Sequence, residues 1–390
     1  FVPEFIESIK KSQESARKLF WSNFLFLFIV TSVLSLLMII FSKELITLFI
    51  SKKYLVSTEF VDAAQIMLIT MAFYLVFVSL AALCMGALNA KRVFFLPAMG
   101  AVLFNLILIV TMLLFPKILV SWGYRSIYAL SIGVLLAGIG QFLLQIPKVI
   151  QLGFKPTLKF NIFHSSNIKI LKALGAGFVG FASVQINILI NSILATSAGV
   201  GAVSWLNYAF RLFQLPIGVI GVSFGSSHLV HFSSLIKENK KEEAVDILKS
   251  SITTSLILAL PTLLVSYILS HSIIHIIYER GVFDAVSTQN TSNALKLYSL
   301  GIPFYILIKI LTPSFYAIGK QKIVVLCSLV SIIVNTCVGY FLLPYIGFAS
   351  LALATTSSSL INMVLQMFFL ARELQLSVMA MIDGKRLIKI

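Results

Sequence analysis

The sequence contains ten apolar runs, each long enough for a helix to cross a lipid bilayer. A bilayer core about 30 Å thick needs about 20 mostly apolar residues in a helix that rises 1.5 Å per residue. Strands or loops exposed to lipid would leave backbone polar groups unpaired, so we expect every run to be helical. The runs cover approximately residues 21–42, 63–88, 94–115, 126–147, 171–198, 204–230, 251–277, 292–318, 323–344 and 349–371. They predict an all-α polytopic membrane protein.

The composition excludes a water-soluble protein. Hydrophobic residues make up 59% of the 390 residues and charged residues 11%, against about 45–50% and about 25% in soluble domains. The net charge of +16 would suggest nucleic-acid binding in a soluble protein. In a membrane protein it indicates cytoplasmic loops beside anionic lipid headgroups. We therefore expect membrane lipids, and no nucleic acid, as partners.

The basic residues assign the loops to the two sides of the membrane. Loops on one side carry 21 Lys and Arg residues and loops on the other side carry six. The positive side of a membrane protein is usually cytoplasmic. Both ends of this chain are therefore predicted to be cytoplasmic.

The charges inside the runs are all positive. Arg211, Lys296 and Lys309 lie within runs, whereas all 14 acidic residues lie outside the runs or at their edges. An ionisable residue inside a membrane usually marks a functional site. Buried Asp or Glu would indicate a cation or proton site, whereas a buried Arg without an acid indicates an anionic substrate.

Arg211 is the strongest candidate for binding that anion. It lies eight residues inside its run, or about 12 Å along the helix axis. Burying its charge costs about 3 kcal/mol or more, and its planar fork of donors suits a phosphate. The alternative is a side chain that extends to the outer interface. Lys309 lies equally deep and is open to both interpretations, whereas Lys296 is expected to be interfacial.

Two further motifs have a functional and a structural interpretation. Pro216 and Gly218 predict a hinge after Arg211, and Gly218, Gly221 and Gly225 fit close helix packing better than a nucleotide-binding loop. His271 and His275 have metal-ligand spacing, but no third ligand is evident and an interfacial helix end is the simpler interpretation. We expect no metal site and no catalytic site.

A weak internal repeat predicts two lobes. Residues 86–92 and 316–322 match at an offset of 230, and further pairs match at offsets of 225 and 227. Both copies have the same orientation, which predicts two six-helix lobes related by a parallel repeat, with a substrate site between them. The second copy begins with two runs that have no counterpart in the first. The repeat therefore predicts that two helices are missing at the N-terminal side.

Several motifs resemble one transporter family. Residues 207–222 read NYAFRLFQLPIGVIGV and resemble the signature helix of the MurJ (MviN) family of peptidoglycan lipid II flippases, in the MOP exporter superfamily. Similar matches are GALNA at 86–90, GVLLAGIGQ at 133–141, ERGVFD at 279–284 and FYAIG at 315–319. The resemblance covers nearly the whole chain.

The resemblance implies an architecture. A complete member has fourteen helices, and this chain would lack the first two and the last two. Residues 1–150 would form the N-terminal lobe (helices 3–6 of the family) and residues 151–390 the C-terminal lobe (helices 7–12).

The resemblance also implies site residues. The arginine of the family's eighth helix corresponds to Arg211, and we expect Arg211, Lys309, Asn207 and Gln214 to bind substrate. Some members bind sodium through an aspartate with Asn and Thr partners. The matching positions are Asn191, Asn335 and Thr355, and Asn191 supplies no carboxylate, which argues against sodium binding.

The function implied is translocation of lipid II, an undecaprenyl-diphosphate-linked peptidoglycan precursor, across the bacterial inner membrane for cell-wall biogenesis and cell shape. Alternating access would need no cofactor, with the membrane potential or a monovalent cation as the driving force. Other cell-wall synthesis proteins are expected partners. The alternatives are a polysaccharide-lipid or drug/cation exporter of the same superfamily, a membrane glycosyltransferase, and a scaffold. A drug exporter predicts a carboxylate inside the membrane, and a glycosyltransferase predicts Asp or His groups in an aqueous loop.

Overall fold

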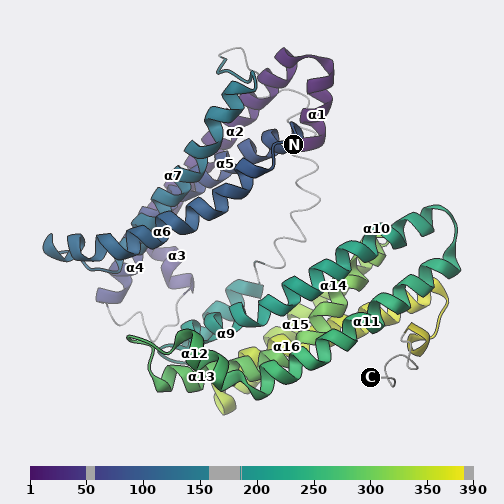
Figure 1. Ribbon diagram of the computed structural model, residues 1–390. Coiled ribbons are helices and arrows are strands. Elements are labelled where there is room, and N and C mark those ends of the chain that lie inside the picture. Colours follow the sequence, from purple (N-terminus) through teal and green to yellow (C-terminus); the bar gives the residue numbers. More distant parts are fainter. Residues whose placement is uncertain (50–57, 158–184, 186, 382–390) are drawn as a thin grey trace. The chain divides into compact units, whose positions relative to one another are not determined.

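The protein is all-helical in the part that the computed structural model describes, which is residues 1–49, 58–157, 185 and 187–381. These residues form helices and turns and no strand. The chain divides into two compact units, Phe1–Val179 and Gly180–Ile390, each of which is a bundle of long helices (Figure 1). The all-α prediction is confirmed. The two lobes and their parallel repeat stay a prediction, since residues 158–184 lie outside the described part.

The first unit is built from four long helical stretches that pack around small and aromatic residues. The aromatic core at one end contains Phe5, Phe20 and Phe154, all fully buried, with 5.1 Å between the ring centroids of Phe5 and Phe154. Its helices are α1 (Val2–Lys11), α2 (Gln13–Ile40), α3 (Ser42–Phe49), α4 (Thr58–Ala72), α5 (Tyr74–Ala90), α6 (Phe95–Ser121) and α7 (Tyr128–Gln151).

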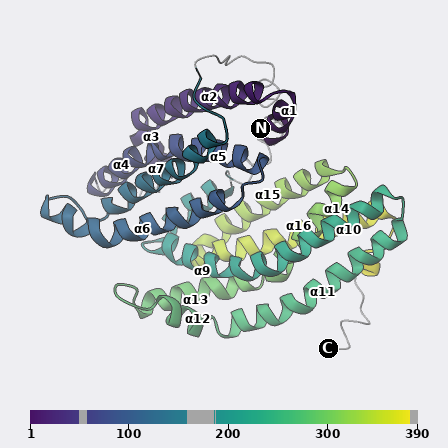
Figure 2. The same cartoon turned by 45° about the horizontal axis from the view of Figure 1, so that its top comes forward.

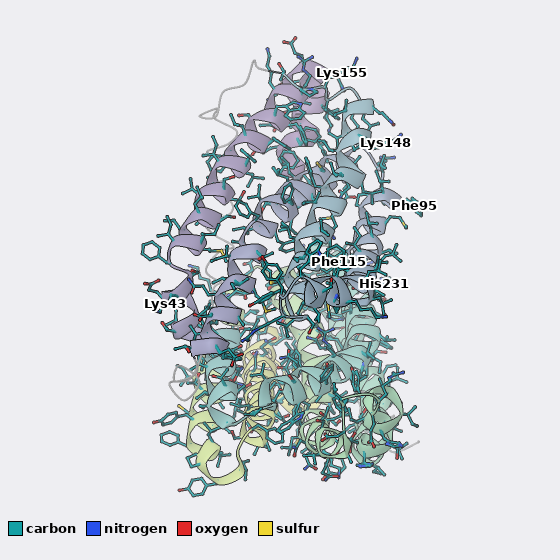
Figure 3. The ribbon with its side chains drawn as sticks, turned by 90° about the vertical axis from the view of Figure 1, so that its left-hand side faces the viewer. Lys43, Phe95, Phe115, Lys148, Lys155 and His231 are labelled. Carbon is teal, nitrogen blue, oxygen red and sulfur yellow. The ribbon has the colours of Figure 1, made fainter. Side chains whose placement is uncertain are left out.

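Three lysines of the first unit can be compared with the charge pattern. Lys148 and Lys155, from predicted cytoplasmic segments, lie toward one end of this bundle, and Lys43, from a predicted outer loop, lies at the other end (Figure 3). Between the ends, many large apolar side chains point outward; Leu113 on α6 is 70% exposed. Such exposure suits side chains that face lipid.

The second unit contains two hydrophobic clusters that join its helices along their length. Figure 2 shows α10, α14 and α16 of this unit side by side, in agreement with their contacts. Its elements are the helix Asn187–Ala198, α9 (Ala202–Pro216), η1 (Ile217–Val222), α10 (Ser223–Lys237), α11 (Lys241–Ile268), α12 (Ser270–Tyr278), α13 (Ala285–Ser299), α14 (Ile302–Ala317), α15 (Gln321–Ile346), α16 (Ala349–Leu374) and η2 (Val378–Met381).

Eight helical segments of the described part are long and apolar enough to cross a membrane, or nine if the bent pair α13 and α14 is one span. They correspond to nine of the ten predicted runs. The remaining run, 171–198, lies mostly outside the described residues, which include only its end, Asn187–Ala198. The prediction of a polytopic membrane protein is confirmed.

The span formed by α13 and α14 is broken. The two helices meet at an angle of 45° at Leu300 and Gly301, and Pro303 follows in the first turn of α14. The break leaves the carbonyl group of Leu297 without its helical partner, and the Thr356 hydroxyl of α16 donates to that carbonyl at 2.7 Å. A side chain from a neighbouring helix therefore satisfies the interrupted backbone.

Candidate functional site

Arg211 lies on an exposed face of the second unit. It belongs to the candidate span Ala202–Lys237, nine residues from its start, which is about 14 Å along the axis. None of the ion pairs within the described residues involves Arg211. The Tyr278 hydroxyl group lies within electrostatic range of Arg211. The guanidinium group therefore remains available to an anion.

The other predicted residues of this helix share the face of Arg211. Asn207, Gln214 and Gly218 are all exposed, and their spacing of three or four residues places them in one row along α9 and η1. Asn207 donates to the Val203 carbonyl group at 2.8 Å. Nothing would contact a Cβ atom at Gly218, so this row borders open space.

Pro216 marks a change of helix type. α9 ends at Pro216 and continues as η1, a π-helix. A proline ring clashes with the carbonyl group four residues earlier and lacks an N–H donor, and a wider helical turn accommodates both effects. The structure thus places a helix irregularity at the predicted hinge, and the hinge movement itself stays a prediction.

Lys309 on α14 lies beside the same continuous helix, about three turns from Arg211. Its carbonyl group contacts Gly225, and its Cγ atom would be 3.2 Å from a Cβ atom at Gly221. The Lys309 stem therefore runs from Gly225 toward Gly221, in the direction of Arg211. Gly221 and Gly225 are buried, so the packing interpretation of the glycines holds for these two. Gly218 is exposed, and no described residue would contact a Cβ atom there.

The residues of the candidate ion site form two contacts. Asn335 donates to the Thr355 hydroxyl at 3.5 Å, and Asn191 donates to the Asn187 side chain at 3.2 Å. The oxygen atoms Oδ1 of Asn191 and Asn335 are both buried and accept no hydrogen bond in the described part.

The helices that carry these two amide groups are neighbours in the second unit. A Cβ atom at Gly339, one turn beyond Asn335, would be 3.5 Å from Leu194, which lies nearly one turn beyond Asn191. Buried amide oxygens of this kind are ligands that a hard monovalent cation prefers, and the ion site itself stays a prediction. The site contributes no carboxylate to neutralise the charge.

One of the two outer histidines, His275, contacts the acidic side chain of Glu279. His275 Nδ1 lies 2.7 Å from Glu279 Oε2, one further helical turn along α12. In the described residues, no group of three or more His, Cys, Asp and Glu side chains is close enough to hold a metal ion. The sequence does contain a signal for Glu279: it follows His275 by four residues, the same spacing that separates His271 from His275.

Two further features were not found from the sequence. Tyr208, Tyr278 and Phe283 form an aromatic cluster next to Arg211, and His228 connects α10 to Ser251 of α11 and Ser314 of α14. Both features join residues that are distant in the sequence, so no local pattern indicates them.

Comparisons with known proteins agree on one family. Residues 1–389 match the family described as lipid II flippase MurJ. The probable lipid II flippase MurJ of Rickettsia prowazekii (strain Madrid E) is 32% identical over 384 residues, which cover 97% of this chain and 74% of the relative. The corresponding protein of Buchnera aphidicola subsp. Schizaphis graminum (strain Sg) is 30% identical over 367 residues, with 94% and 70% covered.

Solved structures show the same relationship. A lipid II flippase MurJ in an inward closed conformation has a TM-score of 0.81 and 25% identity, with 98% of this chain and 77% of that chain covered. An inward-facing MATE transporter of the MOP superfamily has a TM-score of 0.79 and 13% identity, with 96% and 84% covered, which shows a shared fold. This chain belongs to the lipid II flippase MurJ family.

Proposed function

We propose that this chain moves lipid II from the cytoplasmic to the outer leaflet of the bacterial inner membrane by alternating access. It is a multi-pass membrane protein of a family whose relatives carry the name lipid II flippase. The observation that supports this role best is Arg211, a cation within a candidate span that has no acidic partner among the described residues. A guanidinium group in such surroundings favours an anionic ligand.

In this proposal, Arg211 binds the diphosphate group of the substrate. Asn207 and Gln214 flank it on the same exposed face and supply amide hydrogen bonds. Lys309 on α14 lies beside Gly221. Gly221 follows Arg211 by ten residues, or about 15 Å along the helix axis, and the Lys309 stem points toward Arg211. We assign Lys309 to the path along which the diphosphate moves.

In this proposal, the negative charge of the substrate and the positive charge of Arg211 also indicate what drives transport and what class of protein this is. A membrane potential that is negative inside favours outward movement of an anion by about 2.3 kcal/mol per charge per 100 mV. The protein acts as a transporter without a catalytic step or cofactor, and its partners are lipid II and membrane lipids. A drug/cation exporter needs a carboxylate inside the membrane, whereas every acid in the described candidate spans lies within two turns of a span end.

The test is transport of lipid II by the full-length protein in vesicles. Arg211→Ala should lower the transport rate at least tenfold, whereas Arg211→Lys should keep part of it because the charge is retained. Arg280→Ala is the matched control: Arg280 is an exposed outer arginine, and the one hydrogen bond of its side chain within the described residues goes to the Ile277 carbonyl group. A correctly inserted Arg211→Ala protein with wild-type transport would refute the assigned role.

A further inference from the structure

An aromatic cluster lies where α9 meets the outer end of α12. It consists of Tyr208 on α9, Tyr278 at the end of α12 and Phe283 in the turn before α13. The ring centroids of Tyr208 and Tyr278 are 4.8 Å apart, those of Tyr208 and Phe283 are 5.5 Å apart, and those of Tyr278 and Phe283 are 5.8 Å apart. Three elements thus hold the rings in a fixed arrangement, since aromatic pairs at these distances attract one another.

The aromatic cluster adjoins the candidate anion site. Tyr208 precedes Arg211 by three residues, so both side chains lie on one face of α9. The Arg211 charge also acts on the Tyr278 hydroxyl group. Tyr208 is 38% exposed, whereas Tyr278 and Phe283 are partly buried. Tyr278 and Phe283 therefore support a Tyr208 ring that remains accessible beside the guanidinium group.

We propose that Tyr208, supported by Tyr278 and Phe283, binds the sugar that is attached directly to the diphosphate of the substrate. The proposal rests on the proposed function, in which Arg211 holds that diphosphate. A pyranose ring has a face of C–H groups and an edge of hydroxyl groups. The electron-rich face of an aromatic ring attracts the C–H groups, and the tyrosine hydroxyl groups can exchange hydrogen bonds with the sugar edge. Tyr208 is thus a specificity residue that distinguishes sugar-bearing from sugar-free lipid diphosphates.

The experiment compares two lipids that share the diphosphate and the tail. Binding of lipid II and of sugar-free undecaprenyl diphosphate is measured with the purified full-length protein and its variants. Tyr208→Ala should weaken lipid II binding about tenfold, a typical loss for a ring contact, and leave undecaprenyl diphosphate binding within about twofold. Tyr208→Phe, which keeps the ring, should restore most of the lipid II affinity.

Tyr267→Ala is the matched control, because Tyr267 is 40% exposed on the outer half of the neighbouring helix α11. It should change neither affinity. An equal loss of both lipids in Tyr208→Ala would show that the ring only supports Arg211 or anchors the helix at the lipid interface, and would overturn the proposal. So would unchanged lipid II binding. If the wild-type protein binds neither lipid, the proposed function itself fails.

Discussion

Gly225 on α10 and Lys309 on α14 touch through their backbones, so that a Cβ atom at residue 225 would overlap the Lys309 carbonyl oxygen. Gly221, four residues earlier, makes room for the Lys309 stem. Close approach of helix backbones through small residues is a common way to join helices in a membrane. The position of Lys309 relative to α9 and η1 therefore depends on these two glycines.

Gly225→Ala should destabilise the second unit. The added methyl group must push α10 away from α14, and overpacking of this kind costs about 1–3 kcal/mol. Thermal unfolding of the purified protein in detergent measures the loss. Gly218→Ala is the matched control in the same continuous helix, since a Cβ atom there would meet no described residue outside its own stretch of helix within 4 Å. Equal stability of the two variants would contradict the contact.

His228 makes a directional chain of hydrogen bonds across three helices. The Ser314 hydroxyl donates to the Ile310 carbonyl group at 3.0 Å, so its oxygen must accept from His228 Nε2, 2.8 Å away. The remaining ring nitrogen, Nδ1, then accepts from the Ser251 hydroxyl at 3.2 Å. This assignment uses both nitrogens of a neutral imidazole that is only 2% exposed.

His228→Phe should lower the free energy of unfolding by about 1–3 kcal/mol, because it leaves two buried hydroxyl groups without their ring partners. The phenyl ring retains most of the volume, so the loss reports the hydrogen bonds rather than a cavity. Denaturant titration of the solubilised protein gives the value. His231, labelled in Figure 3, is exposed on the same helix, and His231→Phe should stay within about 0.5 kcal/mol of the wild type.

The membrane-spanning helices follow from the sequence because apolar length and backbone hydrogen bonding leave few alternatives. Among the described residues, nine of the ten predicted runs correspond to helices long enough to span a membrane, and the end of the tenth run is helical as well. The 45° break at Gly301 was not predicted, since a glycine followed by proline two residues later is tolerated inside many membrane helices. Its stability depends on Thr356, which is distant in the sequence.

Part of the candidate site could likewise be predicted from the sequence, and part could not. Arg211, Asn207 and Gln214 could be placed on one face from helical spacing alone. The position of Lys309 depends on the packing of α14 against η1 and α10, and the aromatic cluster depends on the turn that returns Phe283 to α9. Such contacts arise from tertiary structure, and no periodicity in the sequence encodes them.

We expect lipid II transport not to require sodium, because the candidate ion site at Asn191 and Asn335 has amide groups and no carboxylate. Their buried oxygen atoms can coordinate a cation, but without a carboxylate the site has no charge to offset the lost hydration of the ion. Replacing sodium by potassium should change lipid II transport less than about twofold, within the range of weak ion effects. Asn191→Asp should introduce sodium-dependent thermal stabilisation, and Ser197→Asp, at an exposed position of the same helix, is the control. A strong sodium requirement of the wild-type protein would contradict this prediction.

The turn between α12 and α13 should lose stability in acid. Thr288 and the His275 ring, whose Nδ1 lies 2.7 Å from Glu279 Oε2, lower the pKa of Glu279 from its ordinary value of 4.5. The Ser287 amide lowers the pKa of Asp284, which caps α13. A carboxyl group whose pKa is lower in the folded state stabilises the fold fully above its unfolded pKa. That stabilisation disappears as the pH falls through the folded value.

Amide hydrogen exchange of residues 270–299 should therefore accelerate between about pH 5 and about pH 3, after correction for the intrinsic pH dependence of exchange. Glu279→Gln cannot ionise, so it should weaken this acid response while raising exchange at neutral pH. Lys11 and Glu7 of α1 form an exposed ion pair at 2.7 Å, and Glu7→Gln serves as a control that leaves the turn unchanged. Identical acid responses in the wild type and Glu279→Gln would show that the Glu279 hydrogen bonds do not hold the turn against which Tyr278 and Phe283 pack.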